Sequence, residues 1–154
     1  MQLALKDIPS AFTPAHLMPP VLARPLYDGT VSAGHSGFAS PAQGYEQKQL
    51  DLNQHLVTNP PATYYFKVNG HSMVKAGIHD GDMAVVDASL KPKSSDIVVA
   101  SVDGEWMVKR LYKRGNVVKL LSESDDPIHR PVLFKEGQEL EVFGVVTYVI
   151  HKPV

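Results

Sequence analysis

The chain has 154 residues, the size of one ordinary domain with room for a tail, and it can bury a core without covalent cross-links. It contains no cysteine, which excludes a disulfide framework, a thiolate metal site and a cysteine nucleophile, and which suits the cytoplasm, where we expect the protein to be. Fifteen basic and sixteen acidic residues give a net charge of −1, so no overall positive field is available to hold a nucleic-acid backbone or an anionic membrane.

The N-terminal region is rich in proline. Residues 1–36 contain five of the twelve prolines, carry few charges and show no helical or alternating periodicity, so they are predicted to form an extended, flexible arm. Four prolines between Ile8 and Ala23 exclude the continuous helix of a signal peptide or a membrane span. On composition alone, a disordered tail without a function is the favoured interpretation of this arm.

Residues 37–154 are predicted to form the folded domain, and its pattern is that of strands. Aromatic and β-branched runs are separated by Gly, Pro, Asp and Asn, and the connections are too short for βαβ crossovers, so the sheet is expected to be antiparallel. The expected strands are 63–68, 83–87, 97–102, 106–112, 117–121 and 140–150. One or two short helices are expected, at 50–56 and after Ser72.

The strongest local signal is Asp103-Gly104 between two apolar runs, which predicts a type I′ hairpin. Strand alternation after this turn places Lys109 on one face with Met107 and Leu111, where a charge is unexpected. Either the lysine stem follows the sheet until its ammonium group reaches water, or the amine is desolvated and its pKa falls until it can act as a base.

A nucleophile for such a base is offered by Asn69-Gly70-His71-Ser72-Met73, because a glycine can turn the backbone sharply after a strand and present a small hydroxyl residue. The alternative is that Ser72 is only a helix N-cap. Adjacent side chains diverge, so His71 is expected at the surface and not against Ser72. The remaining histidines lack the paired spacing of a zinc site, and we predict no metal and no cofactor. These histidines are His16, His35, His55, His79, His129 and His151.

Several motifs agree in order and separation with one known family. They are Gly70-His71-Ser72-Met73, Asp80-Gly81-Asp82, Val86-Asp87, Asp96-Ile97-Val98-Val99-Ala100, Val102-Asp103-Gly104-Glu105 and Val108-Lys109-Arg110-Leu111. The chain resembles the self-cleaving serine/lysine peptidases of the LexA and UmuD family, and is more similar to the UmuD type in Gly37-Phe38-Ala39-Ser40-Pro41-Ala42, Asp51-Leu52-Asn53-Gln54 and Phe143-Gly144-Val145-Val146. The resemblance covers about Val31 to Ile150.

The resemblance implies a compact, mainly β, antiparallel domain of the LexA/signal-peptidase-like type. Ser72 would be the nucleophile and Lys109 the general base, with an oxyanion hole formed by the backbone of Ser72 and Met73. The substrate would be a bond in the chain's own arm. Val31 before Ala33-Gly34 matches the upstream half of the family's cleavage sequence, whereas the downstream half matches a cut between Ser36 and Gly37, so both bonds stay open.

The same resemblance implies a role and partners. The short arm is no helix-turn-helix domain, which excludes a sequence-specific DNA-binding repressor and points to an accessory protein of a translesion polymerase. The implied partners are a second copy in a homodimer, a UmuC-type Y-family DNA polymerase, and RecA filaments on single-stranded DNA, which trigger cleavage in the SOS response to DNA damage. A signal peptidase is disfavoured because the arm offers no membrane anchor. A dimeric binding module with an idle Ser72/Lys109 pair is the remaining alternative.

Overall fold

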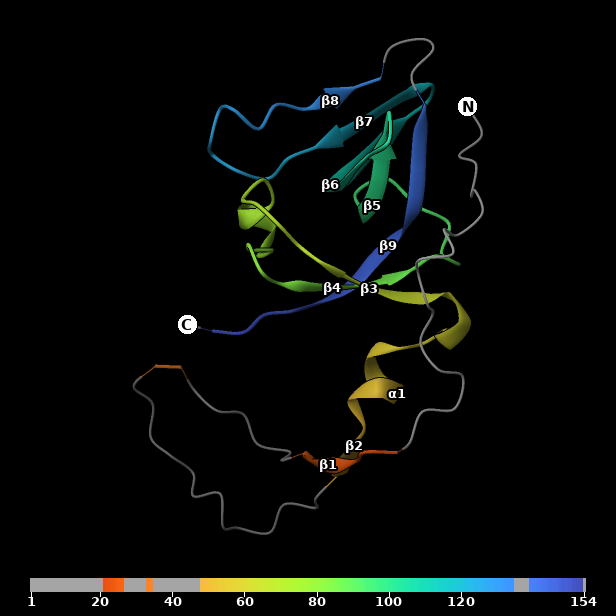
Figure 1. Ribbon diagram of the computed structural model, residues 1–154, viewed down its shortest axis with the longest axis vertical. Coiled ribbons are helices and arrows are strands. Elements are labelled where there is room, and N and C mark those ends of the chain that lie inside the picture. The colour runs from red at the N-terminus through yellow and green to blue at the C-terminus, as the bar shows by residue number, and fades with distance from the viewer. Residues whose placement is uncertain (1–20, 27–32, 35–47, 135–138, 154) are drawn as a thin grey trace.

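A computed structural model of the chain describes residues 21–26, 33–34, 48–134 and 139–153. Seven strands form one sheet: β3 (Thr63–Lys67), β4 (Met83–Asp87), β5 (Ile97–Val102), β6 (Glu105–Arg114), β7 (Val117–Leu121), β8 (Val132–Leu133) and β9 (Leu140–Ile150). Their order is β3-β4-β9-β5-β6-β7-β8, and every neighbouring pair is antiparallel (Figure 1). The predicted mainly β, antiparallel fold is confirmed.

The long strand β9 holds the two parts of the sheet together. Its first half pairs with β5 and its second half with β4, and Val145 is aligned with both Val98 and Asp87. The register shifts between Val85 and Val86 in β4 and between Val99 and Ala100 in β5. Such irregularities bend and twist a strand. Figure 1 shows the result: β9, in blue, runs from the layer of β5 to β8 into the layer of β3 and β4.

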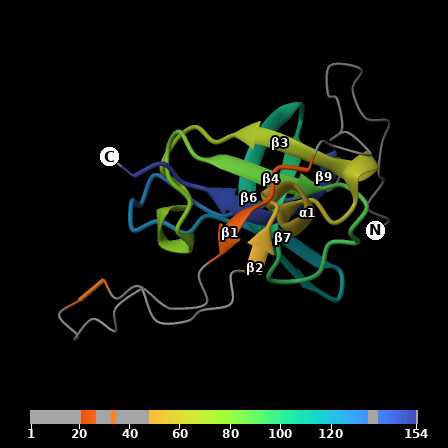
Figure 2. The same cartoon turned by 90° about the horizontal axis from the view of Figure 1, so that it is seen from below.

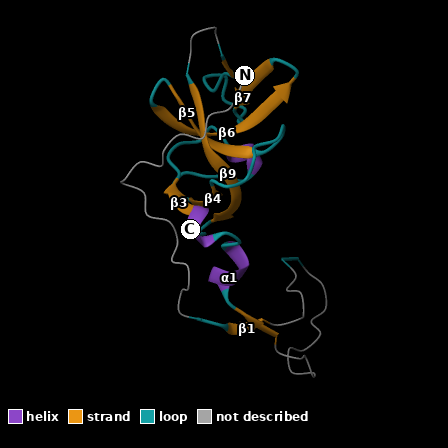
Figure 3. Ribbon diagram, turned by 90° about the vertical axis from the view of Figure 1, so that its right-hand side faces the viewer, coloured by secondary structure: helices purple, strands orange, loops and turns teal. Residues whose placement is uncertain are grey.

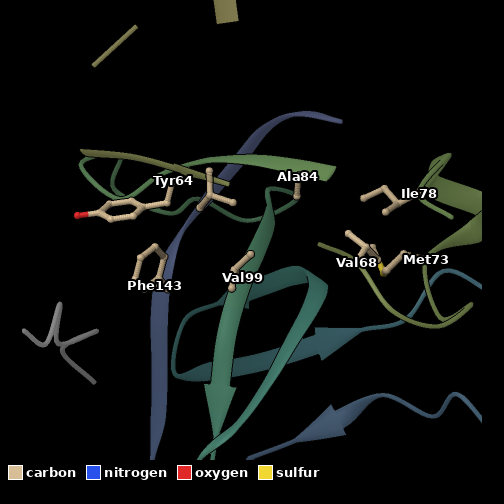
Figure 4. Close-up of a cluster of buried hydrophobic side chains, with 8 residues drawn as sticks. Tyr64, Val68, Met73, Ile78, Ala84, Val99 and Phe143 are labelled. Atoms are coloured by element: carbon tan, nitrogen blue, oxygen red, sulfur yellow. The ribbon is translucent and has the colours of Figure 1, made fainter. Parts of the chain in front are cut away.

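Buried apolar side chains form two clusters. The first contains Tyr64, Val68, Met73, Ile78, Ala84, Val86, Val99 and Phe143 (Figure 4), and the second contains Val98, Ala100, Val102, Leu111, Val118, Leu120, Val142 and Val145. Phe143 contacts Tyr64 and Phe66 edge-on, with both pairs of ring centroids 5.0 Å apart, a favoured aromatic geometry. Because Met73 is buried in the first cluster, the residue before it, Ser72, is fixed relative to the sheet.

The helices are short, as predicted. Helix α1 spans Leu52–Leu56, and the 3₁₀ helices η1 and η2 span Pro60–Ala62 and Val74–Ala76. Helix α1 begins two residues later than predicted because the Asp51 carboxylate caps it, accepting hydrogen bonds from the backbone N–H groups of Asn53 and Gln54. Among the described residues, no helix has the length and apolar character needed to cross a membrane.

Part of the predicted arm forms a strand, which the sequence reading missed. Strand β1 (Arg24–Leu26) pairs with β2 (Lys48–Leu50) (Figure 2), and α1 lies between this two-stranded sheet and the large one (Figure 3). Leu22 N–H also donates a 2.6 Å hydrogen bond to the Asp51 carboxylate. A three-residue strand containing Pro25 has too few residues to show an alternating pattern.

Gly144 in β9 permits a close approach that the fold requires. A Cβ atom at this position would lie 2.7 Å from the Asp87 carbonyl oxygen and 2.9 Å from Ala88 Cα. We therefore expect Gly144→Ala to lower the free energy of unfolding by about 1 to 3 kcal/mol, the usual range for overpacking. Urea denaturation measures this, with Val117→Ile as a control that adds carbon at an exposed strand position. Equal stabilities of the two variants would contradict the close packing.

Candidate active site

The chain reverses direction just before Ser72. Gly70 adopts a φ of 97°, which is in the region that favours glycine, and its N–H donates a 2.7 Å hydrogen bond to the Asp80 carboxylate. The next helical turn, η2, has Met73 as its N-cap and no side-chain capping hydrogen bond. The alternative that Ser72 is a helix N-cap is therefore wrong, because the 3₁₀ turn begins one residue later.

Two backbone hydrogen bonds hold the Ser72 segment against the residues that follow β7. Glu123 N–H donates to the Ser72 carbonyl over 2.7 Å, and Lys75 N–H donates to the Glu123 carbonyl over 2.9 Å. The Ser72 segment thus continues the backbone hydrogen bonding of the sheet in a short stretch after β7 ends. Because β7 pairs with β6, these hydrogen bonds also fix where the Ser72 segment lies relative to β6.

Lys109 lies in β6 on the face predicted for it, with Met107 and Leu111 in the second apolar cluster. Only 9% of the residue is exposed, and its Nζ lies 2.6 Å from Ser72 Oγ. Burial lowers the pKa of Lys109 from its ordinary value of 10.5 because an ammonium ion loses hydration in this place. Of the two alternatives for this lysine, the structure has the buried amine.

Ser122 also contacts the Lys109 amine, with Nζ donating to Ser122 Oγ over 3.0 Å. The sequence reading missed this residue. The register aligns Arg110 with Leu121, so Ser122, one residue past β7, lies opposite Lys109. The hairpin turn at Gly115 and Asn116 was the available signal, because a two-residue turn there fixes the register of β6 and β7.

Nearby charges are paired elsewhere. Glu123 forms a close ion pair with Arg110, and Lys75 donates a 2.7 Å hydrogen bond to Asp125. In the part of the chain that the structure describes, no carboxylate forms an ion pair with Lys109. A nearby carboxylate would favour the charged ammonium form, so this arrangement leaves burial to act on the amine.

The backbone around Ser72 has hydrogen-bond donors to offer. Within the described residues, neither the Ser72 N–H nor the Met73 N–H donates a hydrogen bond to another residue. His71 is exposed, as predicted, and forms no hydrogen bond with Ser72. The N–H groups of Ser72 and Met73 are the donors that the family resemblance implies for an oxyanion hole.

The candidate cleavage bonds lie outside this cluster of side chains. Ala33 and Gly34 are both exposed, and the short orange segment that they form in Figure 1 lies off to one side, apart from the strands of the large sheet. Ser36 and Gly37 lie outside the described residues.

One set of possible metal ligands was not predicted from the sequence. His79, Asp82 and His151 come together although they are far apart in sequence, with one ligand atom from each lying within 4.8 Å of the others. Histidine spacing along the chain gave no signal for it because the third ligand follows a distant strand.

A lysine amine buried against a serine hydroxyl is the arrangement that serine/lysine peptidases use. Comparison with known proteins agrees with this class. The family model for Peptidase S24-like proteins matches residues 25–147. Protein ImpA of Escherichia coli is 43% identical over 129 residues, which is 84% of each chain. Protein SamA of Salmonella typhimurium is 44% identical over 76% of this chain and 79% of its own, and Protein MucA of Escherichia coli is 41% identical over 84% and 86%. The chain belongs to the S24-like peptidase family, as a UmuD-type member of the LexA and UmuD group.

The desolvated amine has a cost in stability. We expect Lys109→Met in a Ser72→Ala chain to raise the free energy of unfolding at neutral pH, by about 1 kcal/mol, because methionine fills the space without losing hydration. The advantage should shrink as pH rises. A lysine whose pKa is lowered in the folded state binds more protons when the chain is unfolded. The free energy of unfolding of the lysine protein therefore increases as pH rises from the folded pKa to the unfolded pKa.

Urea denaturation of both chains over a series of pH values measures this difference. A constant or growing advantage for methionine with rising pH would contradict a lowered Lys109 pKa.

Proposed function

We propose that the protein is a self-cleaving peptidase that cuts a bond in its own N-terminal region, with Ser72 as nucleophile and Lys109 as general base. The observation that carries this proposal is the 2.6 Å contact between Ser72 Oγ and a lysine amine that is buried on an apolar sheet face. A serine hydroxyl is a weak nucleophile at neutral pH and needs an acceptor for its proton, which a neutral amine supplies.

The first half of the reaction forms an ester. Neutral Lys109 takes the proton of Ser72 Oγ while Oγ attacks the carbonyl carbon of the scissile bond. The N–H groups of Ser72 and Met73 donate to the oxyanion that develops. The protonated amine then gives its proton to the leaving nitrogen, the C–N bond breaks, and the N-terminal fragment stays attached to Ser72.

The second half releases that fragment by the same groups. Lys109, neutral again, takes a proton from a water molecule, whose oxygen attacks the ester carbon. The proton passes to Ser72 Oγ as the ester bond breaks. Throughout, the Ser122 hydroxyl accepts a hydrogen bond from Nζ and keeps the amine lone pair directed at the reacting atoms.

The bond that is cut is Ala33–Gly34 or Ser36–Gly37. Because either bond belongs to the same chain as Ser72, its effective concentration at Ser72 is high. A modest catalyst can therefore cut one bond selectively. Ala33 and Gly34 are exposed and drawn away from the large sheet (Figure 1), so cleavage requires this segment to reach Ser72, either within one chain or in a second copy.

The role we propose follows the UmuD type. In it, RecA filaments on single-stranded DNA stimulate cleavage in the cytoplasm after DNA damage, and the shortened protein, as a homodimer, joins a UmuC-type Y-family polymerase for error-prone translesion synthesis in SOS mutagenesis. Removal of the arm would change the surface offered to the polymerase. The similarity to ImpA, SamA and MucA over most of each chain supports this assignment.

The self-cleavage proposal predicts a defined fragment. Intact-mass spectrometry after incubation at alkaline pH, or with RecA filaments and nucleotide, should show a C-terminal fragment that begins at Gly34 or Gly37. Ser72→Ala and Lys109→Ala should each leave the chain whole, because one lacks the nucleophile and the other the base.

The matched control is His71→Ala, which removes a neighbouring exposed side chain and should still be cut. An uncut native chain under both conditions would instead support a dimeric binding module with an idle site. A fragment from Ser72→Ala would exclude Ser72 as the nucleophile.

The reaction should also depend on pH in a defined direction. Only the neutral amine accepts the serine proton, so the rate without RecA should rise by about tenfold per pH unit below the Lys109 pKa and level off above it. Because burial lowers that pKa, the plateau should begin below the ordinary lysine value of 10.5. Single-turnover rates from gel densitometry give the profile. A rate that is flat with pH, or equal in Lys109→Ala, contradicts the role of this lysine.

A further inference from the structure

Three side chains with metal-binding chemistry meet where β9 ends. Asp82 directly precedes β4 and His151 directly follows β9, and the register aligns Met83 with Ile150. Antiparallel pairing therefore places Asp82 opposite His151, one residue beyond each strand. His79 joins them through a tight turn, in which Asp82 N–H donates to the His79 carbonyl over 3.2 Å.

The Asp82 carboxylate is oriented by both histidines. It is only 2% exposed, and its Oδ2 accepts a 2.8 Å hydrogen bond from the His79 backbone N–H. Its Oδ1 lies 2.6 Å from Nδ1 of His151, and its Oδ2 lies 3.8 Å from Nδ1 of His79. Burial by itself raises the pKa of Asp82, but the hydrogen bonds from His79 and His151 lower it by more, so the carboxylate is an anion at neutral pH.

We infer that His79, Asp82 and His151 form a binding site for a divalent transition-metal ion of the zinc type. Imidazole nitrogen and carboxylate oxygen are ligands that zinc takes at about 2.0 to 2.2 Å, so neighbouring ligand atoms lie about 3.4 Å apart in a tetrahedron. His151 Nδ1 lies 2.6 Å from Asp82 Oδ1 and His79 Nδ1 lies 3.8 Å from Asp82 Oδ2, and one ligand atom from each of the three residues falls within 4.8 Å of the others. Small side-chain rotations bring the three groups around one ion.

The two histidine side chains are exposed enough for an ion to reach the site and for a water molecule to bind it there. The side chains of His79 and His151 are 50% and 49% exposed, whereas Asp82 is buried beneath them. The two imidazole rings have centroids 5.2 Å apart and are tilted by 52°, so they do not stack face to face. Three protein ligands and one water complete the four positions that zinc prefers.

An ion at this place links two distant parts of the chain. His79 and Asp82 belong to the segment that follows Ser72, where Ile78 N–H donates to the Met73 carbonyl over 3.2 Å, and His151 belongs to the C-terminal end. The bound ion would therefore fasten the end of β9 to the segment that carries the nucleophile. This is independent of whether Ser72 cuts the arm.

The test uses the untagged full chain carrying Ser72→Ala, which prevents self-cleavage. Isothermal titration calorimetry with Zn²⁺ alone should show about one ion per chain. At a hundredfold excess over its dissociation constant, Zn²⁺ should raise the melting temperature by about 5 to 10 °C, because it binds the folded chain only. Co²⁺ should give the intense visible absorption of a four-coordinate site.

The ligands are tested by His79→Gln and His151→Gln, which replace half-exposed side chains and should leave the circular dichroism spectrum unchanged. Each should weaken Zn²⁺ binding at least about tenfold, whereas the exposed His71→Gln should not. Unchanged affinity in both ligand variants, or no zinc-dependent rise in melting temperature, would overturn the site. The weak absorption of six-coordinate Co²⁺ would overturn the four-coordinate geometry inferred for this site.

Discussion

The burial of one lysine amine is the interaction on which the site depends. In water, Lys109 would be an ammonium ion that neither accepts a proton nor approaches a serine hydroxyl as a base. Its place among apolar residues of β6 lowers its pKa, and the fold bears the cost of that desolvation. The surrounding clusters offset the cost, because a core that spans both layers of the sheet tolerates one unfavourable group. Reactivity and instability thus have the same physical origin.

The serine is brought to this amine by the backbone and by packing. Ser72 is fixed on one side by burial of Met73, and on the other by the hydrogen bonds that link the 72–75 segment to Glu123. Since Ser122 precedes Glu123 and lies opposite Lys109, the same stretch of chain positions both hydroxyl groups on the amine. The contact therefore exists before any substrate arrives, which is the preorganisation that electrostatic catalysis requires.

Sequence patterns predicted the elements that depend on local signals. The strands at 83–87, 97–102, 117–121 and 140–150 have the predicted bounds, because β-branched runs end at turn residues. Asp103 and Gly104 both have positive φ, as a type I′ turn demands, and this turn set the face of Lys109 correctly. The β1 and β2 pair and β8 were missed because strands of two or three residues carry no periodicity. Ser122 and the cluster around Asp82 were missed because both depend on register between strands, which no window along the chain contains.

A catalytic pair assembled in advance would damage other proteins unless its substrate were restricted. In the proposed reaction, the position of the substrate provides this restriction. The exposed Ala33–Gly34 segment lies apart from the large sheet, whereas the Ser72–Lys109 contact is already formed. In the proposed reaction, the rate then depends on the fraction of chains in which the arm lies at Ser72 and on the fraction of Lys109 that is neutral. A stimulating partner in such a system needs only to favour the conformation in which the arm lies across Ser72. In the proposed reaction such a partner would supply no chemical group, because one serine, one lysine and a tethered segment would suffice for a regulated cut.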